Sequence, residues 1–300
     1  MTPVGSEAGA DSAPCGEAET GVVRSVQALR ARVDAWRGDG LKVGFVPTMG
    51  ALHEGHLSLV RKSLAIADRT VTSIFVNPKQ FSPGEDLDTY PRDEKRDLAL
   101  LRALGCHLAY IPSAEEMYPP GYQTSVAVAD LSNGLCGASR PHFFGGVATV
   151  VCKLLNQCRP DLAVFGEKDY QQLLIIRRMA RDLDIDVDII GGEIAREEDG
   201  LAMSSRNAYL SDDERAVAGK LNVVIADMAA KLARGARVDI VIAEGRAALT
   251  AAGFPSIDYL EVRAAEDLAP QGPGPIAAPS RVFAAAMLGR TRLIDNWPVD

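Results

Sequence analysis

Short apolar segments alternate with amphipathic helical segments through the first two thirds of this chain, and this alternation constrains the fold more than any other feature. Continuous apolar strands of this kind are typical of a sheet that is buried on both faces. When they alternate with helices, the sequence predicts an α/β fold with a parallel sheet and helices on both faces. The expected strands are 41–46, 71–76, 108–111, 162–165 and 187–190, and the expected helices are 22–36, 56–67, 93–104, 147–157 and 171–183.

The pattern changes after Gly191 and Gly192. Two long helical stretches and then three strands follow one another, which indicates a smaller α+β domain. We therefore expect a tail at 1–20, a nucleotide-binding domain at 21–194 and the smaller domain at 195–300. The later expected helices are 212–234 and 238–252, the expected strands are 258–263, 281–287 and 291–296, and 269–280 is a connection rich in Pro and Gly.

Composition narrows the class of protein. A chain of 300 residues is longer than one compact core usually holds, so two domains are expected. The net charge of −8 argues against a general nucleic-acid binder, although ATP needs only a local basic pocket. The five cysteines are odd in number and lack a C-x-x-C pair, which favours reduced thiols in a cytoplasmic protein. No apolar run approaches the ~20 residues of a membrane helix, and no apolar signal core is present, so we expect neither a membrane span nor export.

Residues 45–56 carry the strongest chemical signal. An apolar strand runs into a turn at Gly50, and His53 and His56 then open a helix. Backbone amides at a helix start, backed by the positive end of the helix dipole, form a seat for phosphate, and imidazoles can donate hydrogen bonds to it. Zinc is a weaker alternative because the zinc-protease motif places its histidines at i and i+4. A purely structural turn remains open.

A second cluster follows the expected strand at 162–165. Gly166 allows a ligand to approach the backbone closely, and Lys168 could place a charge on phosphate at the start of the next helix. A solvated helix cap would give the same pattern. The position of the cluster at the end of a parallel strand favours a functional role, because ligands bind at that edge of such sheets.

Two further loops carry polar side chains. Ser204, Ser205 and Arg206 can grip a polyphosphate through charge-assisted hydrogen bonds, although an ordinary Ser-rich loop is an equal alternative. Residues 77–81 follow the second expected strand and offer amide groups that could orient a small polar substrate. A simple turn is the stronger interpretation of that segment by itself. Basic and hydroxyl-bearing loops of this kind suit enzymes that attack the α-phosphate of ATP, where positioning and charge neutralisation supply most of the catalysis.

Taken in order, these motifs closely resemble those of the pantothenate synthetase (pantoate–β-alanine ligase) family. The first motif and the last but one, at 199–207, are shared in looser form with a wider nucleotidylyltransferase superfamily, whereas the whole set is specific to this family. The resemblance covers about residues 22–296. The matching segments are 46–56, 73–81, 90–92, 165–172, 199–207 and 293–296.

The resemblance implies a fold, a reaction and partners. It implies a Rossmann-like N-terminal domain with a lid-like C-terminal domain, in a cytoplasmic homodimer. It implies that pantoate attacks the α-phosphate of Mg²⁺-bound ATP to give pantoyl adenylate and pyrophosphate, and that β-alanine then displaces AMP to give pantothenate. The partners are therefore small molecules, with no nucleic acid and no membrane.

The resemblance also assigns roles residue by residue. It gives the chemistry to His53, His56, Lys168, Ser204, Ser205 and Arg206, with His56 as the proton donor. It places ATP against Met49, Gly50, Ala51, Leu52, His53, Glu54, Gly55, His56, Gly166, Glu167, Lys168, Asp169, Ala195, Met203, Ser204, Ser205 and Arg206. It places the other substrates against Gln80, Gln172, Asn77 and Arg140, and it implies that Asp97 handles the metal.

The chain departs from the family pattern at three places. Phe143 stands where the family has a histidine, and His142 comes one position early. Cys136 stands where a glutamate is common, and Arg96 replaces one of two adjacent acidic residues before Asp97. Two other functions therefore stay open: an enzyme that adenylates a different small carboxylate, and an ATP-binding protein without the chemistry.

Overall fold

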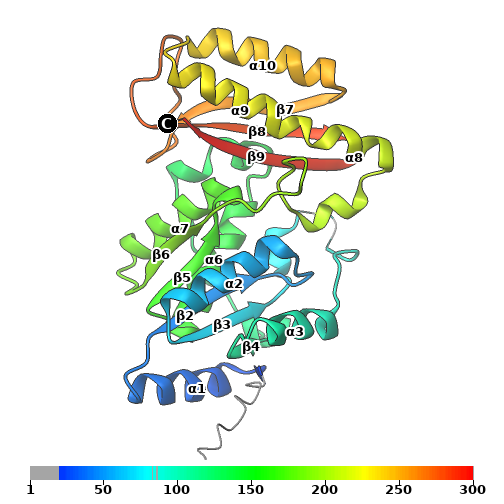
Figure 1. The fold of residues 1–300 in the computed structure, drawn as a ribbon. Helices are drawn as coiled ribbons and strands as arrows, with labels where there is room; N and C mark the ends of the chain where they lie inside the picture. Colours follow the sequence, from blue (N-terminus) through cyan, green and yellow to red (C-terminus); the bar gives the residue numbers. More distant parts are fainter. Residues whose placement is uncertain (1–19, 83, 86, 300) are drawn as a thin grey trace, which may run out of the picture.

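The computed structural model describes residues 20–82, 84–85 and 87–299, so most of the predicted tail lies outside it. Two sheets organise the described chain (Figure 1). A six-stranded sheet occupies the N-terminal part, and a three-stranded sheet lies at the opposite end of the molecule with its own helices. This architecture confirms the predicted Rossmann-like α/β fold with a smaller α+β unit. The boundary predicted between residues 194 and 195 stays a prediction.

The six-stranded sheet is parallel at every pairing between its strands. Its order is β1-β4-β3-β2-β5-β6, so the chain winds outward in one direction from β2 and in the other direction from β5. In open α/β sheets the crevice beyond this switch point is where ligands bind. The strands are β1 (Gly21–Val23), β2 (Val43–Thr48), β3 (Arg69–Ile74), β4 (Leu108–Tyr110), β5 (Leu162–Gly166) and β6 (Asp188–Gly192).

Helices cover both faces of this sheet, as the sequence predicted. On one face, Leu29 and Val33 of α1 pack into a core with strand residues and with α6 and α7. On the other face, Leu57 and Val60 of α2 and Leu101 of α3 form a separate core against the sheet. The helices are α1 (Val26–Gly38), α2 (Glu54–Ile66), α3 (Glu94–Ala103), α6 (Phe143–Cys158) and α7 (Tyr170–Asp182). Two apolar layers therefore hold the sheet rigid beneath the switch point.

Three predicted helices were wrong in detail. The helix expected at 147–157 begins four residues earlier, at Phe143. The helix expected from residue 22 begins at Val26, because Ser25 caps it by accepting from the amide of Ala28 (3.2 Å). The residues before the cap form β1, which pairs with β4. The single helix expected at 212–234 is two helices, α8 (Asp212–Ala218) and α9 (Lys220–Ala233), with the break at Gly219. A Cβ at Gly219 would lie 2.6 Å from Oδ2 of Asp199, so the 199 loop packs directly against this break.

The smaller unit is an antiparallel sheet with helices on one face. β7 (Ser256–Ala264), β8 (Ser280–Leu288) and β9 (Thr291–Val299) pair in that order, and α9 and α10 (Val238–Ala252) pack against them around a second apolar core. The other face of this sheet turns toward the N-terminal part, where Tyr259 and Phe283 contact Leu135 and Leu174. The remaining short helices are η1 (Pro78–Gln80), α4 (Ala114–Met117), η2 (Asp130–Ser132), α5 (Cys136–Ser139), η3 (Glu167–Asp169) and η4 (Ser205–Tyr209).

Candidate active site

A cleft of about 1040 Å³ lies between the carboxyl ends of β2 and β5 and the smaller sheet. Residues from both parts of the chain line it, so it coincides with the switch point of the parallel sheet. Most of the side chains that we predicted to act on ligands meet here, although they are far apart in the sequence. The predicted residues in its lining are Met49, His53, His56, Asn77, Gln80, Arg140, Lys168, Asp169, Gln172, Ser204, Ser205 and Arg206.

His53 and His56 cap the N-terminal end of α2. His53 is the N-cap, and its Nδ1 accepts from the amide of Gly55 (3.1 Å). Nδ1 of His56 in turn accepts from the amide of His53 (3.5 Å), which completes a capping box. Because both Nδ1 atoms act as acceptors, each neutral ring carries its proton on Nε2. Helix capping therefore leaves both rings with an Nε2–H donor, and both rings line the cleft.

The protonation of these rings is set by burial and by a nearby cation. Burial, and then the positive charge of Lys168, lowers the pKa of His53 from 6.5 to about 4. Burial, followed by the charges of His53 and Lys168, lowers the pKa of His56 to about 3. Both rings are therefore neutral donors at pH 7 before a ligand binds. An anion in the cleft would favour their charged forms, because an opposite charge raises the pKa of an imidazole.

The turn that leads into α2 is held by Asp97 of α3. The carboxylate accepts from the amides of Ala51 (2.9 Å) and Leu52 (2.8 Å), and the residue is only 1% exposed. Gly50 and Ala51 both have positive φ, +80° and +50°, so this turn needs external support. The observed contacts of Asp97 fit a structural role in shaping the turn, and its predicted role in handling the metal stays a prediction. Gly50, Ala51 and Leu52 provide this turn beneath Met49 and His53.

The side chain of Asn77 also has a supporting role, because it holds the side chain of Gln80. It is 1% exposed, and its Nδ2 donates to Oε1 of Gln80 (2.9 Å) and to the carbonyl of Gly146 (3.2 Å). Its Oδ1 accepts from the hydroxyl of Tyr118 (2.8 Å). Since Oε1 of Gln80 is the acceptor, Nε2 of Gln80 must face the other way, and it lies 3.2 Å from Sδ of Met49. Asn77 thus sets the orientation of the Gln80 amide in the cleft.

The adjacent residues Gln171 and Gln172 have different positions. Gln171 is buried, and its Nε2 donates to the carbonyls of Leu131 (2.9 Å) and Gly134 (2.8 Å). Gln172 lines the cleft at the start of α7, close to Lys168 and Asp169 in the chain. The resemblance assigned only Gln172 to the substrate, and the structure places Gln172 in the lining of this cleft and Gln171 outside it.

The segment at 195–207 forms a loop that is held by its own hydrogen bonds, and part of it lines the cleft. The amide of Met203 donates to the carbonyl of Ala195 (3.0 Å), and Arg196 and Ala202 form a bridge. The Ser204 hydroxyl caps η4 by accepting from the amide of Arg206 (3.3 Å). Residues 204–206 line the cleft, whereas the carbonyl of Ala195 is already paired within the loop. Met203 lies against the start of α2, 3.6 Å from a Cβ placed at Gly55.

Two of the departures from the family pattern, Phe143 and Cys136, lie at the substrate end of the cleft, whereas Arg96 is exposed on α3 outside the cleft lining. Arg140 pairs with Glu85 through its Nε (2.8 Å) and one terminal nitrogen (2.6 Å), and its guanidinium stacks 3.8 Å from the centre of the Phe143 ring. Phe143 and Cys136 line the cleft, while His142 is exposed and is not in its lining. His142 therefore does not occupy the place of the usual histidine.

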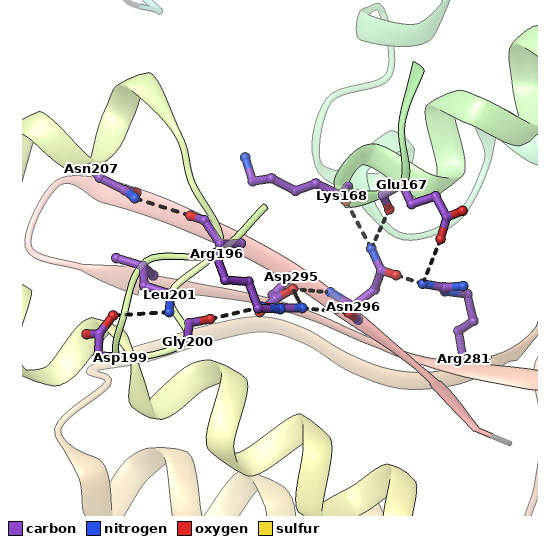
Figure 2. A network of polar contacts seen from close by, with 11 residues as sticks. Glu167, Lys168, Arg196, Asp199, Gly200, Leu201, Asn207, Arg281, Asp295 and Asn296 are labelled. Atoms are coloured by element: carbon purple, nitrogen blue, oxygen red, sulfur yellow. Dashed lines mark hydrogen bonds and ion pairs between the residues drawn. The ribbon is translucent and has the colours of Figure 1, made fainter. Parts of the chain in front are cut away.

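Sequence reasoning missed the role of two residues of β9. Nδ2 of Asn296 donates to the backbone carbonyls of Glu167 (2.9 Å) and Lys168 (3.0 Å), and Asp295 pairs with Arg196 (Figure 2). The motif at 293–296 was noted as part of the resemblance, but it carried no assigned role. No local pattern would reveal these contacts, because the partners are about 100 to 130 residues away.

A parallel sheet whose switch point opens into a cleft lined by neutral histidines, a lysine and two serines defines a nucleotide-binding α/β protein. A sequence model of the pantoate-beta-alanine ligase family matches residues 21–298. Pantothenate synthetase of Paramagnetospirillum magneticum is 56% identical over 279 residues, which are 93% of this chain and 98% of that protein. The chain belongs to the pantoate-beta-alanine ligase family.

Solved structures agree with this assignment. Pantothenate synthetase from Thermus thermophilus superimposes with a TM-score of 0.87 at 44% identity, covering 93% of this chain and 99% of that one. A pantoate-beta-alanine ligase from Francisella tularensis, solved in complex with beta-gamma ATP and beta-alanine, gives 0.78 at 31% identity and covers 93% and 98% of the two chains. Within the described residues, no helix has the length and apolar character needed to cross a membrane.

Proposed function

We propose that this chain condenses pantoate with β-alanine at the expense of ATP, through a pantoyl adenylate, and releases AMP and pyrophosphate. The observation that carries this proposal is that one cleft brings together His53, His56, Lys168 and the Ser204–Arg206 loop opposite Gln80 and Gln172. The family membership supports the same reaction, and the Francisella relative was solved with beta-gamma ATP and with beta-alanine, one of the proposed substrates.

The chemistry of the first step needs donors where negative charge develops. When the pantoate carboxylate attacks the α-phosphorus, the bond to pyrophosphate breaks and charge grows on the leaving oxygens. We assign the Nε2–H groups of His53 and His56 and the ammonium of Lys168 to these oxygens, with His56 as the proton donor. Ser204, Ser205 and Arg206 close over the phosphates from the opposite side. Such fixed donors cost little reorganisation during the reaction, so they stabilise the transition state more than the ground state.

The remaining roles follow from position. Gln80 and Gln172 bind pantoate, and Arg140 lies at the same end of the cleft. Asn77 acts through Gln80, because its amide fixes the orientation of that side chain. The start of α2 seats the phosphates at the positive end of its helix dipole, and the η3 turn and Ala195 serve the ribose and the adenine. The other ATP-site residues that we propose are Met49, Gly50, Ala51, Leu52, Glu54, Gly55, Gly166, Glu167, Asp169 and Met203.

Magnesium fits this site as a companion of ATP. Among the residues that the structure describes, no group of three or more His, Cys, Asp or Glu side chains could hold a metal ion. Mg²⁺ usually keeps several waters and binds substrate phosphates with few protein ligands, so it neutralises phosphate charge when it enters as Mg-ATP. A cytoplasmic location and a homodimer are part of the same proposal and rest on the family alone.

The test is product formation from Mg-ATP and pantoate, with and without β-alanine, with pyrophosphate and AMP followed separately. AMP release that requires both substrates is the expected result. Pyrophosphate release with another carboxylate but not with pantoate would instead identify a relative with a different acid, which Phe143 and Cys136 at the substrate end make the main alternative. Binding of ATP without either product would overturn the catalytic proposal.

A further inference from the structure

The η3 turn that carries Lys168 depends on the C-terminal strand for its hydrogen bonds. No side chain caps this turn at Gly166, and none caps the start of α7 at Asp169. Instead, Nδ2 of Asn296 donates to the carbonyls of Glu167 and Lys168, at 2.9 Å and 3.0 Å. Asn296 is 1% exposed, so water cannot replace these bonds without opening the interface between the two sheets.

Arg281 fixes which way the Asn296 amide points. Nε of Arg281 donates to Oδ1 of Asn296 (2.8 Å), so the amide nitrogen must face the two carbonyls (Figure 2). The guanidinium also lies 3.6 Å from a carboxylate oxygen of Glu167 and stacks 4.2 Å from the centre of the Tyr170 ring. Arg281, which lies on β8 and is almost fully buried, therefore gives the η3 turn a second contact with the smaller sheet.

The preceding residue, Asp295, holds the loop at 196–206, which carries Arg206. Its carboxylate accepts two hydrogen bonds from the guanidinium of Arg196, at 2.7 Å and 3.0 Å, and a third from the amide of Asn296 (2.8 Å). Arg196 also donates to the carbonyl of Gly200 (3.0 Å). Arg196 bridges Ala202 at the other end of this loop, directly before the residues at 203–206. A bidentate pair of this kind fixes direction as well as distance.

We infer that Asp295 and Asn296 are positioning residues that hold the Lys168 turn and the 196–206 loop at a fixed separation across the phosphate end of the cleft. Neither residue needs to touch the reacting atoms, because each acts on the segment that carries a phosphate-binding group. The inference rests on the proposed function, and it gives the motif at 293–296 a role. A displacement of about 1 Å at such a group can cost roughly a hundredfold in rate.

The decisive variant is Asn296→Asp, because it keeps the shape of the side chain and the acceptor for Arg281 but places a carboxylate oxygen against two carbonyls. Asn296→Ala removes the same donor without burying a charge, which keeps the test open if the first variant does not fold. Each Asn296 variant is made in two backgrounds, the protein with Lys168 intact and the Lys168→Met protein. The readouts are the Kd of Mg²⁺-loaded α,β-methylene-ATP, a non-hydrolysable probe, and the rate of pyrophosphate release.

With Lys168 intact, we expect the Kd of the probe to rise about tenfold and pyrophosphate release to fall between tenfold and a hundredfold. On the Lys168→Met background we expect little additional loss, since Asn296 acts through Lys168. An equal loss on both backgrounds in folded protein would show a general structural role and overturn the inference, as would unchanged values with Lys168 intact.

Two controls and one further variant separate this inference from other causes of failure. Asn156→Asp makes the same chemical change on an exposed face of α6 and should leave both readouts unchanged. Asp295→Asn should weaken probe binding in wild type but add little to Arg206→Ala. Pantothenate formation by the wild type is measured in parallel. If the wild type binds the probe but makes no pantothenate, the proposed function fails while the binding cycle still tests the positioning.

Discussion

The imidazole rings of His53 and His56 lie 4.1 Å apart, centre to centre, with their planes tilted by 39°. The two rings share one capping box, so the backbone hydrogen bonds that begin α2 also decide which nitrogen of each ring carries the proton. The same hydrogen bonds therefore begin the helix and leave an Nε2–H donor on both rings. This coupling predicts that the two histidines respond together to changes in pH and in nearby charge.

His56→Ala should lower kcat for the ligation by about 10²- to 10³-fold, which corresponds to about 3–4 kcal/mol of lost transition-state stabilisation. The fold should survive, because Nδ1 of His56 accepts only one long hydrogen bond of 3.5 Å. Steady-state kinetics with circular dichroism on the same sample provide the measurement. His142→Ala is the matched control, since that histidine is exposed outside the cleft lining and should retain near-wild-type activity. A folded His56→Ala protein with wild-type kcat would disprove the role.

The stability of the free protein should fall as the pH drops below about 6.5. The folded-state pKa values are about 4 for His53 and about 3 for His56, whereas an unfolded histidine titrates near 6.5. Between pH 6.5 and about 4 the unfolded chain therefore binds more protons, and the free energy of unfolding decreases through this window. Above it, both states are neutral at these rings and their contribution is constant. Urea denaturation at pH 7.5 and pH 5 measures the slope.

His56→Gln should reduce this pH dependence, because it removes one of the two rings with a lowered pKa. Lys168→Met should raise the pKa of both rings, because its positive charge helps to lower them. Heteronuclear NMR titration of the ring protons reports each pKa directly, with Lys42→Met as an exposed control. Rings that titrate near 6.5 in the wild type would contradict the buried, neutral state.

Asp97→Asn distinguishes loop support from metal binding. An asparagine offers one oxygen and one amide nitrogen, so one of the amides of Ala51 and Leu52 loses its acceptor. We expect a loss of about 1–3 kcal/mol in the free energy of unfolding and an unchanged half-saturating Mg²⁺ concentration. Asp93→Asn on the same helix should be nearly neutral, because Asn caps helices as well as Asp does. A selective rise in the Mg²⁺ requirement of a stable Asp97→Asn protein would restore the metal assignment.

Two neighbouring glycines at the start of α6 should respond in opposite ways to alanine. A Cβ at Gly146 would lie 2.2 Å from the carbonyl oxygen of Lys79 and 2.8 Å from Cα of Gln80, so η1 must move. Gly146→Ala should therefore raise the KM for pantoate about tenfold and destabilise the fold by about 1–3 kcal/mol. A Cβ at Gly145 meets no atom within 4 Å. Gly145→Ala should leave KM unchanged and could stabilise the helix by up to about 1 kcal/mol. Equal effects of the two changes would exclude the close contact as the cause.

Much of the fold was predictable from local sequence alone. The strands that end at Thr48 and Gly166 were expected within two residues, because buried parallel strands leave an uninterrupted apolar pattern. The place of the cleft at their carboxyl ends follows from the same alternation of strands and helices. The motif at 45–56 also indicated histidines at a helix start, since capping and periodicity act over a few residues.

Only the tertiary structure decided what the supporting residues do. Asp97 and Asn77 carry side chains that the resemblance assigned to ligands, and packing places them in hydrogen bonds with the backbone of a distant turn and with Gln80. The hydrogen bond from Nδ2 of Asn296 to the carbonyl of Lys168 joins residues 128 apart in the chain. Hydrogen-bond partners at such separations are fixed by how sheets and helices pack, and not by the periodicity of any segment. The sequence by itself determined the layers and the chemical groups, and the packing of the elements determined the order of the strands, which groups meet and which way each points.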